Sequence, residues 1–174
     1  MDWSKASKIK ALILDVDGVL TDGTVGYSPN ENIKFFNIRD GLAIVLAIKA
    51  GLKVGIISGR ADEVNVRRMN ELKMHFGYFG RINKSAALDE LLEEHNLTEE
   101  ECAYIGDDVI DIPPVRRVEI GCAVQDAVPE LLTYADYHCT HKGGQGAVRE
   151  VIVEILKAKG LWEEALEPFT NLDS

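Results

Sequence analysis

Ile9-Lys-Ala-Leu-Ile-Leu-Asp-Val-Asp-Gly18 combines an apolar run with two acidic residues. The apolar part is typical of a parallel strand that is buried on both faces. Because side chains alternate in direction along an extended chain, Asp15 and Asp17 can both face one pocket while Gly18 lets the backbone turn. One carboxylate can attack while the other handles a proton. Two acids this close repel each other unless a cation lies between them, which indicates a hard divalent ion, with Mg2+ the obvious choice.

Apolar runs alternate with helical patterns along the rest of the chain. We expect strands at 53–57, 102–105, 120–124 and, weakly, 136–139, and helices at 42–48, 61–72, 84–95, 129–134 and 145–159. The stretch around Tyr78 is ambiguous, and residues from about 21 to 37 are expected to form a small β-hairpin flap. The alternation predicts an α/β fold with a doubly wound, mainly parallel, Rossmann-like sheet. Ligands of such sheets bind beyond the carboxyl ends of the strands.

Length and composition predict one compact domain over residues 1–174, with a C-terminal tail from about 160 to 174 whose packing the sequence leaves open. The chain has 174 residues, and 46% of them are hydrophobic, which argues against disorder. The three cysteines are odd in number and lack a C-x-x-C spacing, so we expect buried thiols and no disulfide framework.

The charge of the chain limits its partners. A formal net charge of −10 argues against a general affinity for nucleic acid or an anionic membrane. The first residues lack an apolar secretory core, and no run approaches the ~20 apolar residues of a membrane span, so we expect a cytoplasmic protein. An anionic substrate would require local positive charge.

Four polar clusters fall at or just beyond expected strand or loop ends. They are Asp15 with Asp17, Ser58-Gly59-Arg60, Lys84, and Asp107 with Asp108 and Asp111. Taken singly, each has an ordinary interpretation: a turn, a helix N-cap at Ser58, a solvated lysine at a helix start, and a strand-to-helix turn. Their order and placement together favour metal-assisted phosphoryl transfer, because three crowded acids indicate a metal or a costly repulsion.

Two later segments are weaker signals. His138-Cys139-x-His141 is too incomplete for a structural zinc site and is interpreted as an edge strand. Gly143-Gly-Gln-Gly146 lacks a full nucleotide-binding pattern and is interpreted as a flexible helix entry. Arg149 is either a surface-paired residue or a contact for substrate anions.

The ordered set of clusters resembles the haloacid-dehalogenase superfamily of phosphatases over nearly the whole chain. By that resemblance, Asp15 is the nucleophile that forms an aspartyl-phosphate. Asp17 protonates the leaving alkoxide and then activates water. The resemblance implies that Asp15, the backbone carbonyl of Asp17 and Asp107 hold Mg2+, and that Asp108 or Asp111 acts through water or orients Lys84.

The same resemblance implies the contacts to the substrate. Ser58 and the next backbone amide, that of Gly59, hold the transferring phosphoryl group, and Lys84 adds a positive charge. Arg60 is a candidate contact for a substrate carboxylate or hydroxyl, because its planar guanidinium suits a carboxylate.

The intervals from Asp17 to Ser58 and from Ser58 to Lys84 leave no room for the separate cap domain of many relatives. The chain therefore resembles the capless branch of 3-deoxy-D-manno-octulosonate 8-phosphate phosphatases. The segments that carry this resemblance include Val19 to Gly23, Ile38 to Gly41 and the late glycine segment. That branch implies a homotetramer whose neighbouring subunits cover the site, and a sugar-acid product for lipopolysaccharide synthesis.

The sequence alone leaves other functions open. A nonulosonate 9-phosphate or another sugar phosphate is an alternative substrate, although Arg60 favours the octulosonate. A protein phosphatase would be a monomer with an exposed cleft. A different class of function is a noncatalytic binding or assembly module, against which the intact set of acids and Lys84 argues.

Overall fold

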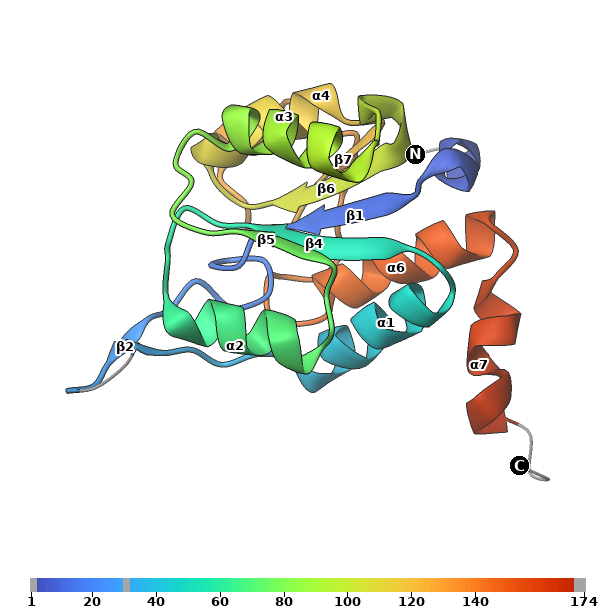
Figure 1. The fold of residues 1–174 in the computed structure, drawn as a ribbon, viewed down its shortest axis with the longest axis horizontal. Helices are drawn as coiled ribbons and strands as arrows, with labels where there is room; N and C mark the ends of the chain where they lie inside the picture. Colours follow the sequence, from blue (N-terminus) through green and yellow to red (C-terminus); the bar gives the residue numbers. More distant parts are fainter. Residues whose placement is uncertain (1–2, 30–31, 171–174) are drawn as a thin grey trace.

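A six-stranded parallel sheet forms the centre of the computed structural model, which describes residues 3–29 and 32–170 (Figure 1). Every pair of neighbouring strands in this sheet is parallel, which confirms the predicted fold class. From one edge to the other, the strands are β5 (Phe76–Tyr78), β4 (Lys53–Ile57), β1 (Ala11–Leu14), β6 (Cys102–Gly106), β7 (Ile120–Ala123) and β8 (Tyr137–His138).

Helices cover both faces of the sheet (Figure 1). One face carries α1 (Ile38–Lys49), α2 (Glu63–Glu71) and α6 (Ala147–Ala158), and the other carries α3 (Lys84–His95) and α4 (Ile112–Arg117). The short helix α5 (Pro129–Leu132) precedes β8. Short 3-10 helices lie at Trp3–Lys8, Glu99–Glu101 and Val109–Asp111.

β1 is buried along its whole length between these layers. Because both of its faces are covered, the strand is a continuous apolar run and does not alternate with polar residues. Burial of one Leu or Ile side chain contributes about 1.5–3 kcal/mol, so this run anchors the middle of the sheet. It thereby fixes the position of Asp15, the residue that directly follows β1. All three cysteines are buried free thiols, as predicted.

Most element boundaries follow the sequence-based expectation. β4 and α3 span the predicted residues, and the ambiguous stretch around Tyr78 is β5. α1 begins earlier than predicted, because the Asn37 side chain accepts a hydrogen bond from the Arg39 amide and caps the helix there. α6 begins later, after Gly146, whose φ of 113° is not helical.

The flap and the tail differ in extent from the prediction. In the flap, β2 (Gly26–Tyr27) pairs antiparallel with β3 (Asn32–Ile33), while residues 30–31 of the predicted turn lie outside the described residues. The tail contains a further helix, α7 (Trp162–Thr170), which contacts α1 and α6. Residues 171–174 of the tail also lie outside the described part of the chain.

The carboxyl ends of the strands face one side of the molecule. The arrowheads of β1 and β6 point to the side on which the β2–β3 hairpin projects (Figure 1). The loops that follow β1, β4 and β6 therefore meet there, as expected for a ligand site in a parallel sheet. Within the described ranges, no helix is long and apolar enough to cross a membrane.

Candidate active site

Three carboxylates meet beyond the ends of two neighbouring strands. Asp15 directly follows β1, Asp107 directly follows β6, and Asp111 ends the 3-10 helix after it. Each of the three offers an oxygen atom, and these oxygens all lie within 4.8 Å of one another. Asp15 and Asp111 are buried and Asp107 is partly buried. An all-oxygen set of this kind suits a hard divalent cation such as Mg2+.

Two further observations show that the cluster fits a metal ion. Asp107 Oδ1 is buried and has no hydrogen-bond partner, so it is free to bind a cation. Gly18 packs against the same carboxylate: a Cβ atom at Gly18 would lie 2.0 Å from Asp107 Oδ2. Only glycine therefore lets the loop after β1 lie this close to the Asp107 side chain.

The acids are crowded enough to perturb their protonation. The pKa of Asp107 is raised to about 8, first by burial and then by the nearby carboxylates of Asp15 and Asp111. Burial also raises the pKa of Asp15 to about 6, although the ammonium group of Lys84 opposes the shift. A bound cation would favour the ionised form of both groups.

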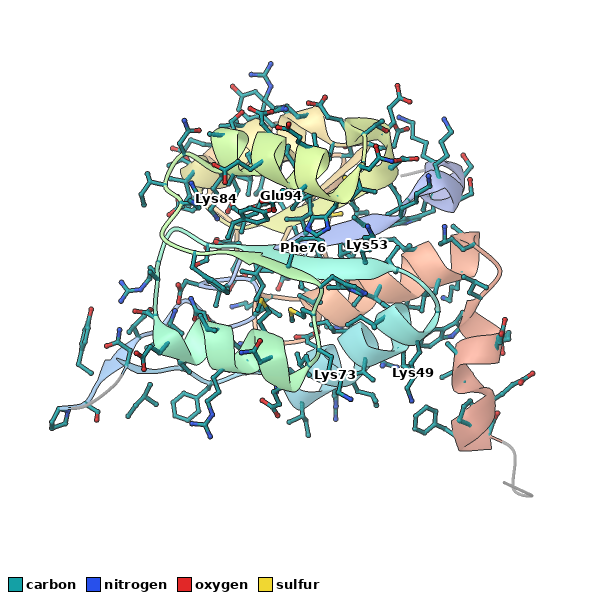
Figure 2. All side chains as sticks on the ribbon, in the orientation of Figure 1. Lys49, Lys53, Lys73, Phe76, Lys84 and Glu94 are labelled. Carbon is teal, nitrogen blue, oxygen red and sulfur yellow. The ribbon has the colours of Figure 1, made fainter. Side chains whose placement is uncertain are left out.

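Lys84 is the positive charge inside this cluster. Its Nζ atom lies 2.9 Å from Asp15 Oδ1 and 2.6 Å from Asp111 Oδ1, and its side chain is buried. Burial opposes the charge, but Asp15 and Asp111 outweigh it, so the pKa of Lys84 is raised. The interpretation of Lys84 as a solvated lysine at a helix start is therefore wrong. Figure 2 shows it between α3 and the sheet, toward the carboxyl ends of the strands.

Asp111 orients Lys84. Its Oδ1 accepts hydrogen bonds from Lys84 Nζ at 2.6 Å and from the Tyr104 hydroxyl at 2.7 Å. Its Oδ2 accepts from the backbone amides of Asp107 and Asp108, at 3.0 and 3.3 Å. Both oxygens are thus engaged by the protein. Tyr104 was not anticipated, because a tyrosine in an apolar strand carries no sequence signal of a polar contact.

Asp108 has a local structural contact. It is exposed, and its Oδ1 accepts a hydrogen bond from the Val109 amide at 2.6 Å. This bond caps the 3-10 helix that carries Asp111. Asp108 therefore supports the helix from which Asp111 reaches Lys84.

Asp17 lies in the loop after β1, but its carboxylate binds a different lysine. Lys34 Nζ, from the segment after β3, lies 2.6 Å from Asp17 Oδ1 and 2.9 Å from Oδ2. Arg60 Nε lies 4.0 Å from Asp17 Oδ2 and 2.8 Å from Asp62 Oδ2. The structure therefore places Arg60 beside Asp17, and the predicted contact of Arg60 with substrate stays a prediction. Lys34 was missed, because a single lysine in a flap carries no motif.

Ser58 is buried directly beyond β4, next to the strand that delivers Asp15. Its Oγ accepts a hydrogen bond from the Arg60 amide at 3.2 Å. The following helix, α2, begins at Glu63 with Asp62 in the N-cap position, so the interpretation of Ser58 as a helix N-cap is wrong. Gly59 faces the side chains of Ile82, from the loop after β5, and Ile110, from the 3-10 helix after β6.

The loop after β1 is held from inside by Thr21. The Thr21 hydroxyl accepts hydrogen bonds from the Gly18 and Gly23 amides, at 3.3 and 3.2 Å. It also lies 3.3 Å from the Val16 carbonyl oxygen, to which it donates. Thr21 is fully buried. One side chain thus ties together the turn that carries Asp17.

The glycine segment before α6 supports the same loop from outside. A Cβ atom at Gly143 would lie 1.7 Å from the Gly18 carbonyl oxygen, and one at Gly144 would lie 2.6 Å from the Thr21 carbonyl carbon. The buried Asp40 accepts hydrogen bonds from the Gly146 and Arg149 amides and so fixes the start of α6. The interpretation of this segment as a flexible helix entry is therefore wrong, since close backbone packing requires its glycines.

Arg149 lies outside the cluster of Asp15, Asp107 and Asp111. Its guanidinium carbon is 5.7 Å from the centre of the Trp162 ring, a cation–π contact that holds the side chain toward α7. It lines a surface hollow to which Asp15, Asp107 and Asp111 contribute nothing. The predicted contact of Arg149 with substrate stays a prediction. His141 pairs with Glu150 at 2.6 Å and is not part of the acidic cluster.

Comparisons with known proteins agree with this geometry. Residues 78–152 match the model of the haloacid dehalogenase-like hydrolases. The 3-deoxy-D-manno-octulosonate 8-phosphate phosphatase KdsC of Escherichia coli strain K12 is 44% identical over 163 residues, covering 93% of this chain and 87% of that protein. The chain belongs to this family of haloacid dehalogenase-like phosphatases. The predicted family is therefore confirmed.

Solved structures of the phosphatase family share the whole fold. The enzyme from Moraxella catarrhalis, solved with a magnesium ion, a phosphate ion and a KDO molecule, is 35% identical with a TM-score of 0.93, and the match covers 97% of each chain. The enzyme from Yersinia pestis is 42% identical with a TM-score of 0.90, covering 92% of this chain and 88% of that one. The likeness thus extends over the elements that carry Asp15, Lys84 and Asp107.

For the metal-free protein, we expect the free energy of unfolding to decrease as pH rises from about 4 to about 8. The folded-state pKa values of Asp15, about 6, and Asp107, about 8, exceed the ordinary value of 3.8, so the folded state binds more protons across this window. Protons compete with Mg2+ for the same oxygens. The rise in melting temperature on adding Mg2+ should therefore grow toward pH 8, as thermal unfolding in EDTA and in Mg2+ would measure.

The variant Asp107→Asn should lose most of the Mg2+ response and flatten the pH dependence in EDTA. A matched control is Asp89→Asn, an exposed carboxylate on α3, which should retain both. A Mg2+ response that is equal at about pH 5 and about pH 8, or that survives in Asp107→Asn, would contradict this account of the cluster.

Proposed function

We propose that this chain is a Mg2+-dependent phosphomonoester hydrolase that converts 3-deoxy-D-manno-octulosonate 8-phosphate to 3-deoxy-D-manno-octulosonate and phosphate. The observation that carries the proposal is the buried Lys84 ammonium, held between Asp15 and Asp111 beside an acidic cluster that suits a cation. The substrate is proposed from the family, because relatives such as the Escherichia coli phosphatase act on this sugar-acid phosphate.

In this mechanism, Asp15 is the nucleophile. One of its oxygens forms a bond to phosphorus as the bond to the sugar oxygen breaks, which gives an aspartyl-phosphate. Asp17 gives its proton to the departing alkoxide and then takes a proton from the water that hydrolyses the aspartyl-phosphate. Covalent catalysis thus divides a difficult displacement into two steps, and one acid/base group serves both.

The remaining residues of the site neutralise and hold the phosphoryl group. Asp15, the Asp17 backbone carbonyl and Asp107 would hold Mg2+, which would supply positive charge at the phosphate oxygens. Lys84, whose Nζ atom lies 2.9 Å from Asp15 Oδ1, adds a second positive charge. The Ser58 hydroxyl and the Gly59 amide donate hydrogen bonds to the phosphoryl oxygens. A preorganised donor of this kind contributes about 2.7–4 kcal/mol to transition-state stabilisation.

Arg60 is proposed to contact the sugar-acid part of the substrate. Its side chain is 42% exposed beside Asp17, so it borders the site and can still reach a ligand. A guanidinium binds a carboxylate in a bidentate manner, which suits an ulosonate. The nonulosonate 9-phosphate carries the same carboxylate and is the nearest alternative substrate.

The chain is proposed to act as one cytoplasmic phosphatase domain within a homotetramer whose neighbouring subunits cover the site. Support comes from the flap and the start of α1, where large apolar side chains are exposed. Phe35 is 80% exposed and Ile38 is 83% exposed. Tyr27, Ile33 and Leu42 are exposed in the same part of the chain. Apolar groups gathered in this way favour contact with another protein surface.

The substrate proposal is tested by phosphate release in Mg2+ across a panel. The panel contains the octulosonate 8-phosphate, a nonulosonate 9-phosphate, hexose phosphates and a phosphopeptide. We expect the highest kcat/KM for the octulosonate 8-phosphate. Preference for another member would reject this substrate but keep the chemistry, and no release from any member would favour a noncatalytic binding module.

The variant Asp15→Asn should lose turnover by about four orders of magnitude or more, because an amide cannot replace the attacking carboxylate. Circular dichroism should show that the fold is retained. The control Asp89→Asn should keep turnover within a factor of about two. Unimpaired phosphate release by Asp15→Asn would remove this residue as the nucleophile.

The variant Phe35→Asp should dissociate the assembly, because burying an unpaired charge at a subunit contact is costly. Sedimentation should show a smaller species than for the unmodified chain, and turnover of the octulosonate 8-phosphate should decrease at least about tenfold. The control Tyr134→Asp changes a half-exposed aromatic residue that follows α5, away from the flap. A fully active monomer would overturn the proposal that neighbours complete the site.

A further inference from the structure

A second buried lysine lies at the site, on the side of Asp17. Lys34 follows β3 of the flap, yet its side chain has no exposed surface. Its Nζ atom contacts Asp17 at 2.6 Å and 2.9 Å, Asp62 Oδ2 at 2.9 Å and Asn65 Oδ1 at 3.0 Å. An ammonium group has three protons to donate, and here three side chains receive them.

These contacts join three segments that are separate in the sequence. Asp17 belongs to the loop after β1, whereas Asp62 is in the N-cap position of α2 and Asn65 lies in the first turn of that helix. The flap makes a second contact with the same residue, since Asn32 Nδ2 donates to Asp62 Oδ1 at 2.8 Å. Lys34 therefore fastens the flap to α2 and to the Asp17 loop at one point.

A buried ion pair is a poor way to stabilise a fold. Removing both charges from water costs several kcal/mol per ion, and well-packed apolar residues often do as well. Lys84 cannot serve Asp17, because it is already engaged by Asp15 and Asp111. The two buried lysines thus contact different aspartates: Lys84 binds the proposed nucleophile and Lys34 binds the proposed acid/base residue.

We propose that Lys34 is a positioning residue for the proton transfers of Asp17, and that it makes these transfers depend on the seating of the flap. The inference rests on the proposed acid/base role of Asp17. Lys34 contacts both oxygens of the Asp17 carboxylate, which fixes the rotation of the carboxyl group and hence the direction in which its proton leaves. When the flap is not seated, the carboxylate loses this support.

Dependence on the leaving group distinguishes positioning from a general structural role. An alkoxide needs a proton as it departs, whereas 4-nitrophenolate is stable without one. General acid catalysis typically contributes about 10²–10⁴-fold. Hydrolysis of the aspartyl-phosphate is the same step for both substrates and contributes to kcat, so the comparison uses kcat/KM, which reports the steps through formation of that intermediate. For Lys34→Met, we expect kcat/KM for the octulosonate 8-phosphate to decrease about 10²-fold or more, and kcat/KM for 4-nitrophenyl phosphate to decrease less than about tenfold.

Three further variants complete the experiment. Asp17→Asn should show the same leaving-group pattern, and adding Lys34→Met to it should cause no further loss, because the two residues act through one proton transfer. Asn65→Ala removes one acceptor of Lys34 and leaves Asp17 intact, so it should give a smaller loss with the same dependence on the leaving group. This variant replaces Lys34→Met in the test if Lys34→Met does not fold. Lys49→Met, an exposed lysine on α1 (Figure 2), should match the unmodified chain.

The outcomes separate this inference from the proposed function. Equal losses of kcat/KM on both substrates in Lys34→Met, or a full additional loss in the double variant, would overturn the positioning role while leaving Asp17 as the acid/base residue. If Asp17→Asn itself does not distinguish the two substrates in kcat/KM, the assignment of Asp17 as the general acid fails and this inference fails with it. Leaving-group dependence in Lys34→Met and Asn65→Ala, absent in Lys49→Met, supports the inference.

Discussion

The concentration of negative charge at the ends of β1 and β6 is the constraint on which the rest of the site depends. Three carboxylates each have an oxygen atom within 4.8 Å of the others, and the chain as a whole is strongly acidic. Such a group persists only if positive charge is supplied from within or by a bound cation. Lys84 supplies it from α3, and Tyr104 and two backbone amides hold Asp111 so that Lys84 stays in place.

Much of this arrangement could be predicted because its signals are local. The run before Asp15 is apolar throughout, so it indicates a strand that is covered on both faces, and parallel strands bring their carboxyl ends together. β4 and α3 begin and end at the residues that the sequence pattern predicts. The order of the four polar clusters then placed Asp15, Lys84 and Asp107 in one site before any distance was known.

The parts that were missed depend on contacts between distant segments. Lys34 has no distinguishing sequence context, and its role depends on the contact of the flap with α2 and the Asp17 loop. Gly143 and Gly144 look like flexible residues until their backbone is seen against Gly18 and Thr21. Tyr104 has the sequence context of a core residue, and only the position of Asp111 gives its hydroxyl a partner. No local pattern encodes these pairings.

The contact of Gly143 with the Gly18 carbonyl also bears on how the protein is made. Gly18 is synthesised early and Gly143 late. During translation, the turn that carries Asp17 therefore lacks its contact with Gly143 until most of the chain has emerged. Contacts between such distant residues form late and slowly in folding. An unfinished chain therefore holds both aspartates without the backbone support that fixes them. Competence for chemistry is in this sense a property of the completed chain, acquired when the segment before α6 docks.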